Sequence, residues 1–332
     1  MIISRTPFRI SFFGGGTDYP VWYKQHGGAV LATSINKYSY ITCRNLPPFF
    51  DYKYRILYSK TELTKNIADI QHPAVHATLD FMDIHQGLEI HHDGDLPARS
   101  GLGSSSSFTV GLLHVLYAQK GKVVTKRRLA LDAIHIEQDI LKENVGAQDQ
   151  TSAAFGGFNK IEFGGEQQIQ VRPITINQKK CHLLQDHLML FFTGFSRFAS
   201  EIACEQIKKT PDKQIELRKM QEMVDDAINI LNGGDSDISD FGKLLHDSWT
   251  IKRNLTDKIS TPEIDNIYNT ARESGAIGGK LLGAGGGGFI LFFVEPERQP
   301  AVRESLKNLL YVPFKFDTTG SQIIYYVPEN ND

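Results

Sequence analysis

The first half of the chain combines short apolar runs with longer stretches in which apolar residues recur at helical spacing. The apolar runs predict strands at Phe8–Phe13, within Ala29–Cys43 (as one or two strands) and at Leu88–His92. Apolar residues repeated on one helical face predict helices at Ser104–Gln119 and Lys126–Lys142. This part of the chain is therefore expected to contain both a sheet and helices.

The pattern restarts near residue 187, after a predicted hairpin. The remaining predicted elements are the hairpin strands Phe155–Phe163 and Ile169–Ile174, a strand at His187–Thr193, a charged helical region at Ser196–Leu231 broken near Pro211, helices at Phe241–Ile251 and Pro262–Ser274, a strand at Phe289–Val294, a helix at Pro300–Leu310 and two closing strands. Together the two halves predict an α+β fold in two domains, residues 1–178 and 179–332.

Composition excludes several classes of protein. The 332 residues carry 36 Lys and Arg against 38 Asp and Glu, a formal net charge of −2, so no nucleic-acid partner is expected. Three widely spaced cysteines predict neither a disulfide framework nor a cysteine-rich zinc site, and they fit the cytoplasm. The N-terminus lacks a signal-peptide pattern, and the longest apolar runs fall short of the roughly 20 residues that span a bilayer, so no membrane partner is expected.

The segment Pro97–Ser107, PARSGLGSSSS, is the most informative one for function. Gly101 and Gly103 let backbone N–H groups approach a ligand, and the helix predicted from Ser104 adds unpaired N–H donors and a positive dipole end. Together with the serine hydroxyls, these groups predict a nest for a polyphosphate. The alternative is an N-cap serine after a flexible loop.

Two further glycine clusters precede or follow apolar strands. The run Gly283–Gly288 leads into a buried strand, and it predicts either a wall of an active-site cleft or a tight contact between domains. The run Gly14-Gly15-Gly16 is followed by Thr17 and Asp18, whose side chains are suited to hydrogen bonds with sugar hydroxyls. The alternative for this second run is a turn capped by its aspartate.

Two acidic residues are candidates for chemistry. Glu137 lies in a mainly apolar predicted helix, where its carboxylate would either bind magnesium or face solvent. Asp149 lies in NVGAQDQ, which leads into a further helix, and aspartates at such positions are usually caps.

Taken in order, the segments TPFRISFFGGGTDYP, PARSGLGSSSS, NVGAQDQ (after Glu137) and KLLGAGGGG resemble those of the GHMP small-molecule kinases, which include galactokinases, mevalonate kinases and homoserine kinases. The resemblance runs from residue 5 to about residue 290. It implies an N-terminal ribosomal-protein-S5-like domain that binds ATP, a C-terminal ferredoxin-like domain, and an active site in the cleft between them.

The resemblance also implies a role for each matching residue. Asp149 would be the catalytic base and Arg9 its cationic neighbour, whereas Glu137 and Ser105 would hold Mg²⁺. Arg99 departs from the family pattern, in which many members carry glycine. The residues implied for ATP are Pro97, Ser100, Gly101, Leu102, Gly103, Ser104, Ser105 and Ser106, and those implied for the substrate are Gly15, Gly16, Thr17, Asp18, Gly285 and Gly286.

The form FRISFFGGGTDYP is most similar to the branch of this family that holds D-glycero-D-manno-heptose phosphate kinases. It implies phosphorylation of the anomeric hydroxyl of the heptose 7-phosphate to the 1,7-bisphosphate, for nucleotide-activated heptose and the surface glycans made from it, lipopolysaccharide or capsule. Another anomeric sugar kinase, like fucokinase or galactokinase, is the alternative, although galactokinases carry Glu-His where this chain has Gly15 and Gly16. A non-catalytic nucleotide and sugar sensor is a third reading.

A phosphorylated substrate needs an additional anion site. Lys37, Arg44 and Arg197 are the candidates for it, although each is also typical of a solvated surface charge. The sequence leaves open whether the chain forms a homodimer.

Overall fold

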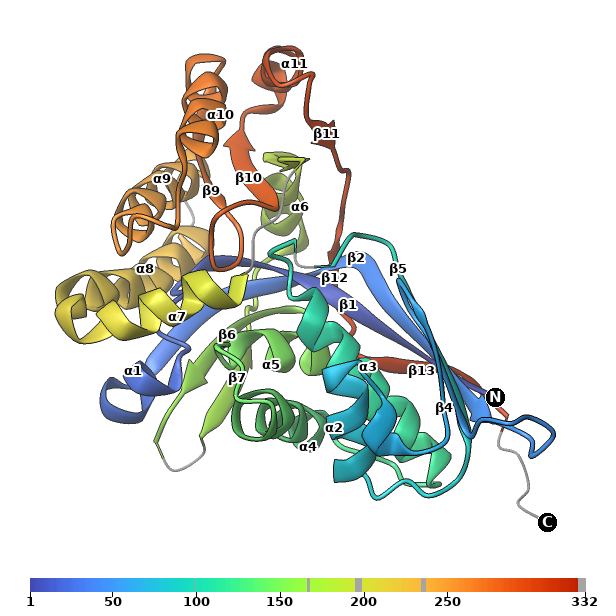
Figure 1. Ribbon diagram of the computed structural model, residues 1–332. Coiled ribbons are helices and arrows are strands. Elements are labelled where there is room, and N and C mark those ends of the chain that lie inside the picture. The colour runs from blue at the N-terminus through green and yellow to red at the C-terminus, as the bar shows by residue number, and fades with distance from the viewer. Residues whose placement is uncertain (99, 166–167, 195–198, 234–236, 328–332) are drawn as a thin grey trace.

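Two β-sheets, each with helices packed against it, organise the chain in the computed structural model (Figure 1). The structure describes residues 1–98, 100–165, 168–194, 199–233 and 237–327. Arg99 and Arg197, which the sequence singled out, lie outside the described residues.

The first sheet is built around one long strand. Strand β2 runs without a break over the 18 residues Gly28–Asn45, where the sequence allowed one or two strands, and it pairs with β1 along most of its length. The sheet has nine strands, in the order β13-β1-β2-β5-β3-β4, with β12, β6 and β7 attached at the side through β2 and β6. Its strands are β1 Ile2–Phe13, β2 Gly28–Asn45, β3 Tyr54–Leu57, β4 Thr61–Thr64, β5 Leu88–Gly94, β6 Phe158–Phe163, β7 Ile169–Pro173, β12 Phe316–Asp317 and β13 Gln322–Tyr326.

The second sheet is smaller and more deeply buried. It has four strands in the order β11-β8-β10-β9, all of them antiparallel to their neighbours. All six residues of β10 are buried, as expected for the continuous apolar run that the sequence shows there. The strands are β8 Leu188–Phe192, β9 Ala276–Leu281, β10 Phe289–Val294 and β11 Leu310–Tyr311.

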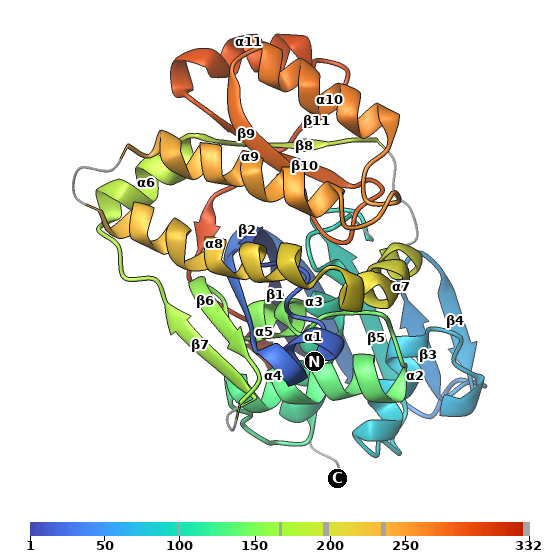
Figure 2. The same ribbon diagram turned by 90° about the vertical axis from the view of Figure 1, so that its left-hand side faces the viewer.

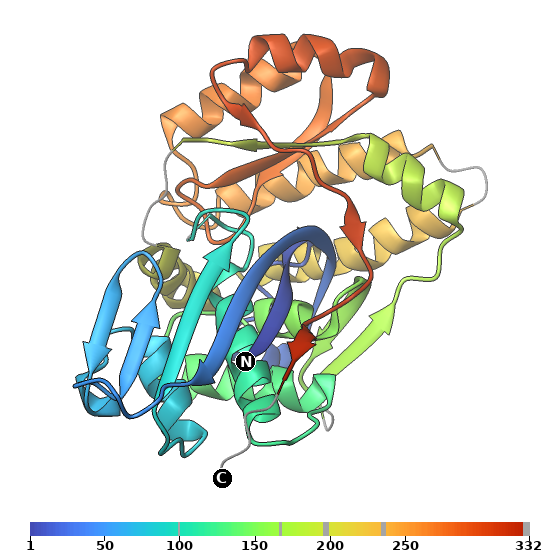
Figure 3. The ribbon, with the colours of Figure 1, turned by 90° about the vertical axis from the view of Figure 1, so that its right-hand side faces the viewer.

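Helices α2 to α5 pack on one face of the first sheet, whereas the view of Figure 3 shows the strands of its other face. Helices α8 and α9 lie between the two sheets, and α10 and α11 lie beyond the second sheet (Figure 2). No helix in the described ranges combines the length and the apolar character needed to cross a membrane. The helical segments are α1 Pro20–His26, η1 Ile67–Asp69, α2 Pro73–Phe81, α3 Ser104–Gln119, α4 Lys126–Ile134, the π-helix η2 His135–Ile140, α5 Gln148–Phe155, α6 Gln178–Asp186, α7 Ala199–Lys209, η3 Thr210–Asp212, α8 Gln214–Asn232, α9 Ser239–Arg253, α10 Pro262–Glu273, η4 Pro296–Arg298 and α11 Gln299–Ser305.

Most of the predicted elements are present, and the differences have physical causes. The helix at Ser104–Gln119 is confirmed, but the predicted helix Lys126–Lys142 changes to a π-helix at His135. The predicted helical region from Ser196 is two helices separated by the short 3₁₀ turn that contains Pro211, because proline lacks the N–H that a continuous helix needs. The elements that the sequence did not predict include α1, α2, α6, β3, β4 and β9, which are short or carry mixed polar and apolar residues.

The end of the chain returns to the first sheet. Strand β13 pairs with β1, and β12 pairs with β2, so the last strands leave the second sheet's layer and run down to the first (Figure 3). The division expected at residue 178 is therefore crossed by strand pairing, and the two parts of the chain share one sheet.

An aromatic cluster joins the two layers around Phe12. This side chain of β1 is 0% exposed and makes edge-to-face contacts with Phe158 of β6, Phe241 of α9 and Phe316 of β12. The four rings come from segments far apart in the sequence, so the cluster ties both halves to the same strand.

Replacing Phe12 by alanine should therefore lower the free energy of unfolding by about 3–5 kcal/mol, because it leaves a cavity among three aromatic partners. The matched control is Phe49→Ala, since Phe49 is 88% exposed, and this change should stay within about 0.5 kcal/mol of the wild type. Denaturant unfolding measures both. A loss below about 1 kcal/mol for Phe12→Ala would show that the cluster does not join the layers.

Candidate active site

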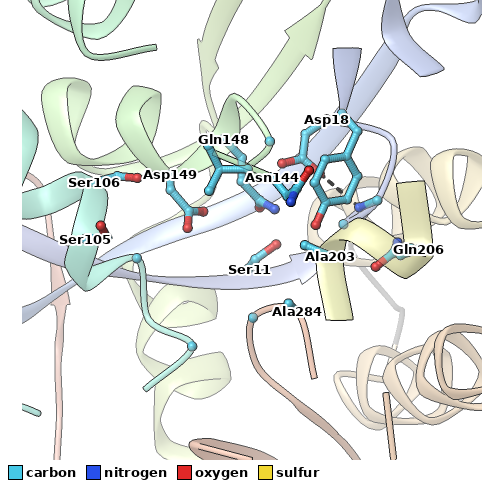
Figure 4. Close-up of a pocket in the computed structure, with 18 of the residues that line it drawn as sticks. Ser11, Asp18, Ser105, Ser106, Asn144, Gln148, Asp149, Ala203, Gln206 and Ala284 are labelled. Carbon is cyan, nitrogen blue, oxygen red and sulfur yellow. Dashed lines mark hydrogen bonds between the residues drawn. The ribbon is translucent and has the colours of Figure 1, made fainter. Parts of the chain in front are cut away.

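A cavity of about 330 Å³ opens where the two layers meet. Its walls come from β1 and the turn after it, the start of α3, the loop before α5, helices α7 and α9, strand β9 and the glycine loop between β9 and β10. Figure 4 shows Ser105, Ser106 and Asp149 on one side of it and Asp18, Asn144 and Gln206 on the other. The residues that line it include Arg9, Ser11, Gly15, Gly16, Asp18, Tyr19, Gly101, Gly103, Ser104, Ser105, Ser106, Asn144, Gly146, Gln148, Asp149, Gln206, Lys252, Lys280, Gly283 and Ala284.

The start of α3 forms one wall. Gly103 takes the left-handed conformation, with φ of 75°, immediately before the helix begins at Ser104. The N–H groups of a helix's first turn have no partner within the helix, so this wall presents donors and a positive dipole end to the cavity. Backbone bonds fix its position, because the N–H of Arg9 donates to the carbonyl of Leu102 at 3.0 Å.

Other residues of this predicted ATP loop hold it in place rather than line the cavity. The Leu102 side chain is fully buried in the apolar core between the sheets. The carbonyl of Ser100 accepts from the N–H of Phe289 at 3.0 Å, which fastens the loop to β10. Pro97 is exposed, at a distance along the chain from the helix start.

Arg9 and Asp149 form the best-defined pair in the cavity. The Nε and Nη2 atoms of Arg9 each donate to one carboxylate oxygen of Asp149, both at 2.8 Å, and Nη1 donates to the carbonyl of Gly101 at 2.6 Å. The Arg9 side chain is 4% exposed and that of Asp149 is 26% exposed. The two hydrogen bonds fix the orientation of the carboxylate, while leaving it accessible from the cavity.

Asp18 lies in the same cavity on the glycine turn after β1. Its Oδ1 accepts from the N–H of Gly16 at 2.9 Å, and burial, with a contribution from the charge of Asp149, raises its pKa. Gly146 packs directly on this carboxyl group, since a Cβ added there would lie 1.8 Å from Oδ2. The turn and the loop before α5 are thus built around the Asp18 side chain.

Thr17, which was predicted to bind substrate, does not line the cavity. Its hydroxyl is fully buried, donates to the carbonyls of Gly14 and Ala29 at 2.8 and 2.9 Å, and accepts from the N–H of Ala29 at 3.1 Å. All of these partners are backbone groups, so the side chain holds the glycine turn against β2, buried away from the cavity.

The glycine loop between β9 and β10 contributes Gly283 and Ala284 to the cavity, but not the predicted Gly285 and Gly286. A Cβ on Gly285 would lie 2.7 Å from the Cα of Ile259, and the N–H of Gly286 donates to the carbonyl of the same residue. These two glycines therefore pack against the segment after α9. The structure does not support a substrate contact from either of them.

The same loop touches the ATP loop backbone to backbone. A Cβ on Gly283 would lie 2.5 Å from the Cα of Gly101, and one on Gly101 would lie 2.4 Å from the carbonyl oxygen of Leu282. Any side chain at either glycine would push the two loops apart. The loop therefore fits both interpretations of the glycine run, because it forms a wall of the cavity and also makes a tight backbone contact with the ATP loop.

Glu137 lies behind the serine wall rather than on the cavity. It is 1% exposed, and its Oε2 accepts from the Ser106 hydroxyl at 2.8 Å and from the Gln150 amide. Its Oε1 is buried without a hydrogen-bond partner, and burial raises the pKa of the carboxyl group to about 7. An unsatisfied buried carboxylate oxygen beside a serine hydroxyl is a donor set that fits a hard cation such as magnesium.

The serine beside Glu137 is Ser106, whereas the sequence pointed to Ser105, which is exposed and lines the cavity. Among the described residues no group of three or more His, Cys, Asp or Glu side chains is arranged to hold a metal ion. A cation bound here would thus take its other oxygens from water and phosphate, as magnesium usually does.

Several lining residues were not predicted from the sequence. Lys252 of α9 and Lys280 of β9 are buried in the cavity wall, and Tyr19, Asn144 and Gln206 also line it. Lys280 directly precedes the Leu281-Leu282 pair that leads into the glycine run. Its place beside this motif could therefore have been used to predict that it lies near the site. Lys252 lies on an ordinary amphipathic helix and gives no such signal.

The cavity does not include the predicted anion-site residues that the structure describes. Arg44 pairs with Glu89 at 2.7 Å on the strands of the first sheet, and neither it nor Lys37 lines the cavity.

The chain is similar to known proteins of one family over most of its length. Residues 62–157 match the profile described as "GHMP kinases N terminal domain" and residues 216–312 match "GHMP kinases C terminal", which together exceed half of the chain. The chain is 29% identical over 317 residues to a D-glycero-alpha-D-manno-heptose 7-phosphate kinase of Campylobacter jejuni, covering 92% of this chain and 93% of that protein. It is 27% identical over 341 residues to a galactokinase of Pyrococcus furiosus, with 92% of each covered.

A solved structure confirms the expected α+β fold. The crystal structure described as a D-glycero-D-manno-heptose 1-phosphate kinase of Bacteroides thetaiotaomicron superposes with a TM-score of 0.73, covering 98% of this chain and all of the other, at 24% identity.

Burial of Glu137 predicts a pH-dependent loss of stability in the absence of metal. The pKa is about 7 in the folded protein against 4.5 as its ordinary value, so the unfolded chain loses this proton at lower pH than the folded one. The free energy of unfolding should therefore fall between about pH 4.5 and pH 7, by on the order of 3 kcal/mol, relative to that of Glu137→Gln.

Denaturant unfolding at pH 4 and pH 8, with a chelator present, tests this expectation. The control is Glu304→Gln on α11, where the side chain is 75% exposed and pairs with a lysine, so the difference between pH 4 and pH 8 should stay below about 1 kcal/mol. A wild type and a Glu137→Gln variant that differ by the same amount at both pH values would contradict it.

Proposed function

The chain belongs to the GHMP kinase family, and from this membership we propose that it is an ATP-dependent sugar kinase that phosphorylates the anomeric hydroxyl of D-glycero-D-manno-heptose 7-phosphate. The observation that carries the proposal is the Arg9–Asp149 pair, held in one cavity with the start of α3. The identity of 29% to a heptose 7-phosphate kinase over nearly the full length supports the sugar.

In the proposed reaction, the sugar hydroxyl oxygen forms a bond to the γ-phosphorus of ATP. The bond from that phosphorus to the bridging oxygen breaks, and ADP leaves with the electron pair. The hydroxyl proton passes to the carboxylate of Asp149, which the two hydrogen bonds from Arg9 hold in a fixed orientation beside the cavity. General base catalysis of this kind contributes roughly 10²–10⁴-fold to a rate.

The phosphate groups would lie against the first turn of α3. The N–H groups there, with the side chains of Ser104 and Ser105, provide fixed donors for negatively charged oxygens, and fixed donors need no reorganisation during the reaction. Glu137 and Ser106 would hold magnesium, which would supply positive charge to offset the negative charge of the phosphate groups. Positioning and charge stabilisation account for most of the rate in phosphoryl transfer.

The sugar would lie on the side of the cavity formed by Asp18, Asn144 and Gln206, across from the serines (Figure 4). Carboxylate and amide groups in this wall suit a molecule with many hydroxyl groups, because they provide both donors and acceptors. Gly15 and Gly16 bring backbone into the same wall and leave room that larger side chains would fill.

The alternative is another anomeric sugar kinase, acting on fucose or an unphosphorylated hexose. The galactokinase relative, at 27% identity, and the polar wall around Asp18 are equally compatible with a neutral sugar. A non-catalytic sensor is disfavoured, because Arg9 and Asp149 are assembled for proton transfer and the family members named here are kinases. We also propose that the product is used in the cytoplasm to make nucleotide-activated heptose for lipopolysaccharide or capsule.

Replacing Asp149 by asparagine should lower kcat by about 10²–10⁴-fold, because an amide cannot accept the proton and presents an N–H₂ group to the guanidinium of Arg9. The control is Asp80→Asn, an exposed aspartate that pairs with His76 on α2, which should leave kcat unchanged. Steady-state kinetics with saturating ATP measures both. A loss below about tenfold would mean that Asp149 only positions the hydroxyl.

A panel of heptose 7-phosphate, unphosphorylated heptose, fucose and galactose, each incubated with ATP and magnesium, tests the substrate. Phosphorus NMR should show a new anomeric phosphate signal with heptose 7-phosphate and much weaker turnover of the others. Turnover of a neutral sugar without turnover of heptose 7-phosphate would establish the alternative.

A further inference from the structure

Two buried lysines line the cavity, and neither has a role in the reaction proposed for Asp149 and Arg9. Lys252, near the end of α9, is 5% exposed, and Lys280, in β9, is 2% exposed. Both come from the C-terminal half of the chain. Burying an ammonium group is costly unless it is paired or hydrogen-bonded, so two such groups beside one cavity need an explanation.

Each lysine is held by a single backbone carbonyl group. The ammonium of Lys252 donates to the carbonyl of Gly283, and that of Lys280 donates to the carbonyl of Phe12 at 2.7 Å. Within the described ranges, no carboxylate forms an ion pair with either lysine. An ammonium group has three donors, so each lysine retains donor capacity beyond its one carbonyl.

The two lysines differ in the pKa of their ammonium groups. Burial, followed by the positive charge of Arg9, lowers the pKa of Lys252 to about 8, so it is mostly charged at neutral pH. Burial and the charges of Lys252 and Arg9 lower the pKa of Lys280 well below its usual range. An anion in the cavity would favour the charged form of both, but Lys252 is the one that is already a cation without it.

The anchor of Lys252 ties it to the ATP loop. Gly283, whose carbonyl holds the ammonium, packs against Gly101, and the carbonyl of Gly101 in turn accepts from Arg9. The chain of contacts therefore leads from Lys252 to the Arg9–Asp149 pair. The ammonium therefore lies at the glycine loop that touches the ATP loop, and the charges of both Asp18 and Asp149 act on it.

We propose that Lys252 is a further catalytic residue, whose ammonium contacts the oxygens of the phosphoryl group in transfer. The proposal rests on phosphoryl transfer from ATP, as proposed above, but not on the identity of the sugar. During transfer the bond to the acceptor oxygen forms and the bond to ADP breaks, while the three remaining oxygens of the phosphoryl group carry negative charge. A fixed cation in a site with little water stabilises that charge more than it stabilises bound ATP. The C-terminal half would thus provide a second cation, beside Arg9 of the N-terminal half, whose guanidinium is engaged by Asp149.

Lys252→Met tests this, because methionine keeps the length of the side chain and removes its charge. We expect kcat to fall by about 10²–10³-fold, while the affinity for ADP alone changes by less than about twofold. The affinity for ADP with magnesium and aluminium fluoride, which mimics the phosphoryl group in transfer, should fall by a factor similar to that of kcat. The matched control is Arg253→Met, the next residue of α9, whose side chain pairs with Asp265 at 3.4 Å and does not line the cavity.

Several outcomes separate this role from others. An unchanged kcat and an unchanged affinity for the aluminium fluoride complex would overturn the proposal. So would a raised KM for heptose 7-phosphate with unaltered turnover of unphosphorylated heptose, because Lys252 would then bind the phosphate of the acceptor.

Lys252→Gln separates a catalytic charge from a structural bond, because it keeps a donor for the Gly283 carbonyl but removes the charge. The same loss of kcat in this variant, with an unaltered thermal unfolding midpoint, supports the catalytic charge. The aluminium fluoride measurement needs no sugar, so its result stands even if heptose 7-phosphate proves not to be the substrate.

Discussion

The double hydrogen bond between Arg9 and Asp149 is the interaction on which the architecture of the cavity depends. Arg9 is placed by the longest strand pairing of the molecule, β1 with β2, and Asp149 by the first turn of α5. The third donor of the guanidinium reaches the carbonyl of Gly101, and the backbone of the same arginine holds Leu102. One side chain therefore fixes the base, the ATP loop and the strand relative to one another, and a planar five-donor guanidinium is suited to this where an ammonium is not.

The second constraint is the contact of the two glycine loops. Because Gly101 and Gly283 meet backbone to backbone, the second sheet reaches the start of α3 more closely than any side chain would permit. This contact brings Gly283 and Ala284 to the cavity, and it places the carbonyl that holds Lys252 next to the ATP loop. The aromatic cluster around Phe12 and the return of β12 and β13 to the first sheet keep the layers in this relation. The site is thus a property of the whole chain and not of either half.

The sequence predicted the elements that carry strong periodicity and the residues that belong to a recognisable motif. It identified Arg9, Asp18, Asp149 and the loop before α3, and the structure brings all of them to one cavity. It assigned Ser105 to the metal, whereas Ser106 is the serine that contacts Glu137, because Ser106 projects from the buried face of α3 and Ser105 from its exposed face. It also assigned a ligand contact to Thr17, whose hydroxyl is used by the backbone of the turn. Lys252 was missed because a lysine on an amphipathic helix is usually solvated, and only the position of β9 and the glycine loop buries it.

A double-mutant cycle on kcat with Arg9→Met and Asp149→Asn tests the central claim most directly. If Arg9 acts through the carboxylate that it orients, removing it once Asp149 has been replaced should have little further effect, and the double variant should be about as slow as Asp149→Asn alone. Losses that multiply, so that the double variant is slower by the product of the two single effects, would show that the two residues act independently and would contradict this account of the site.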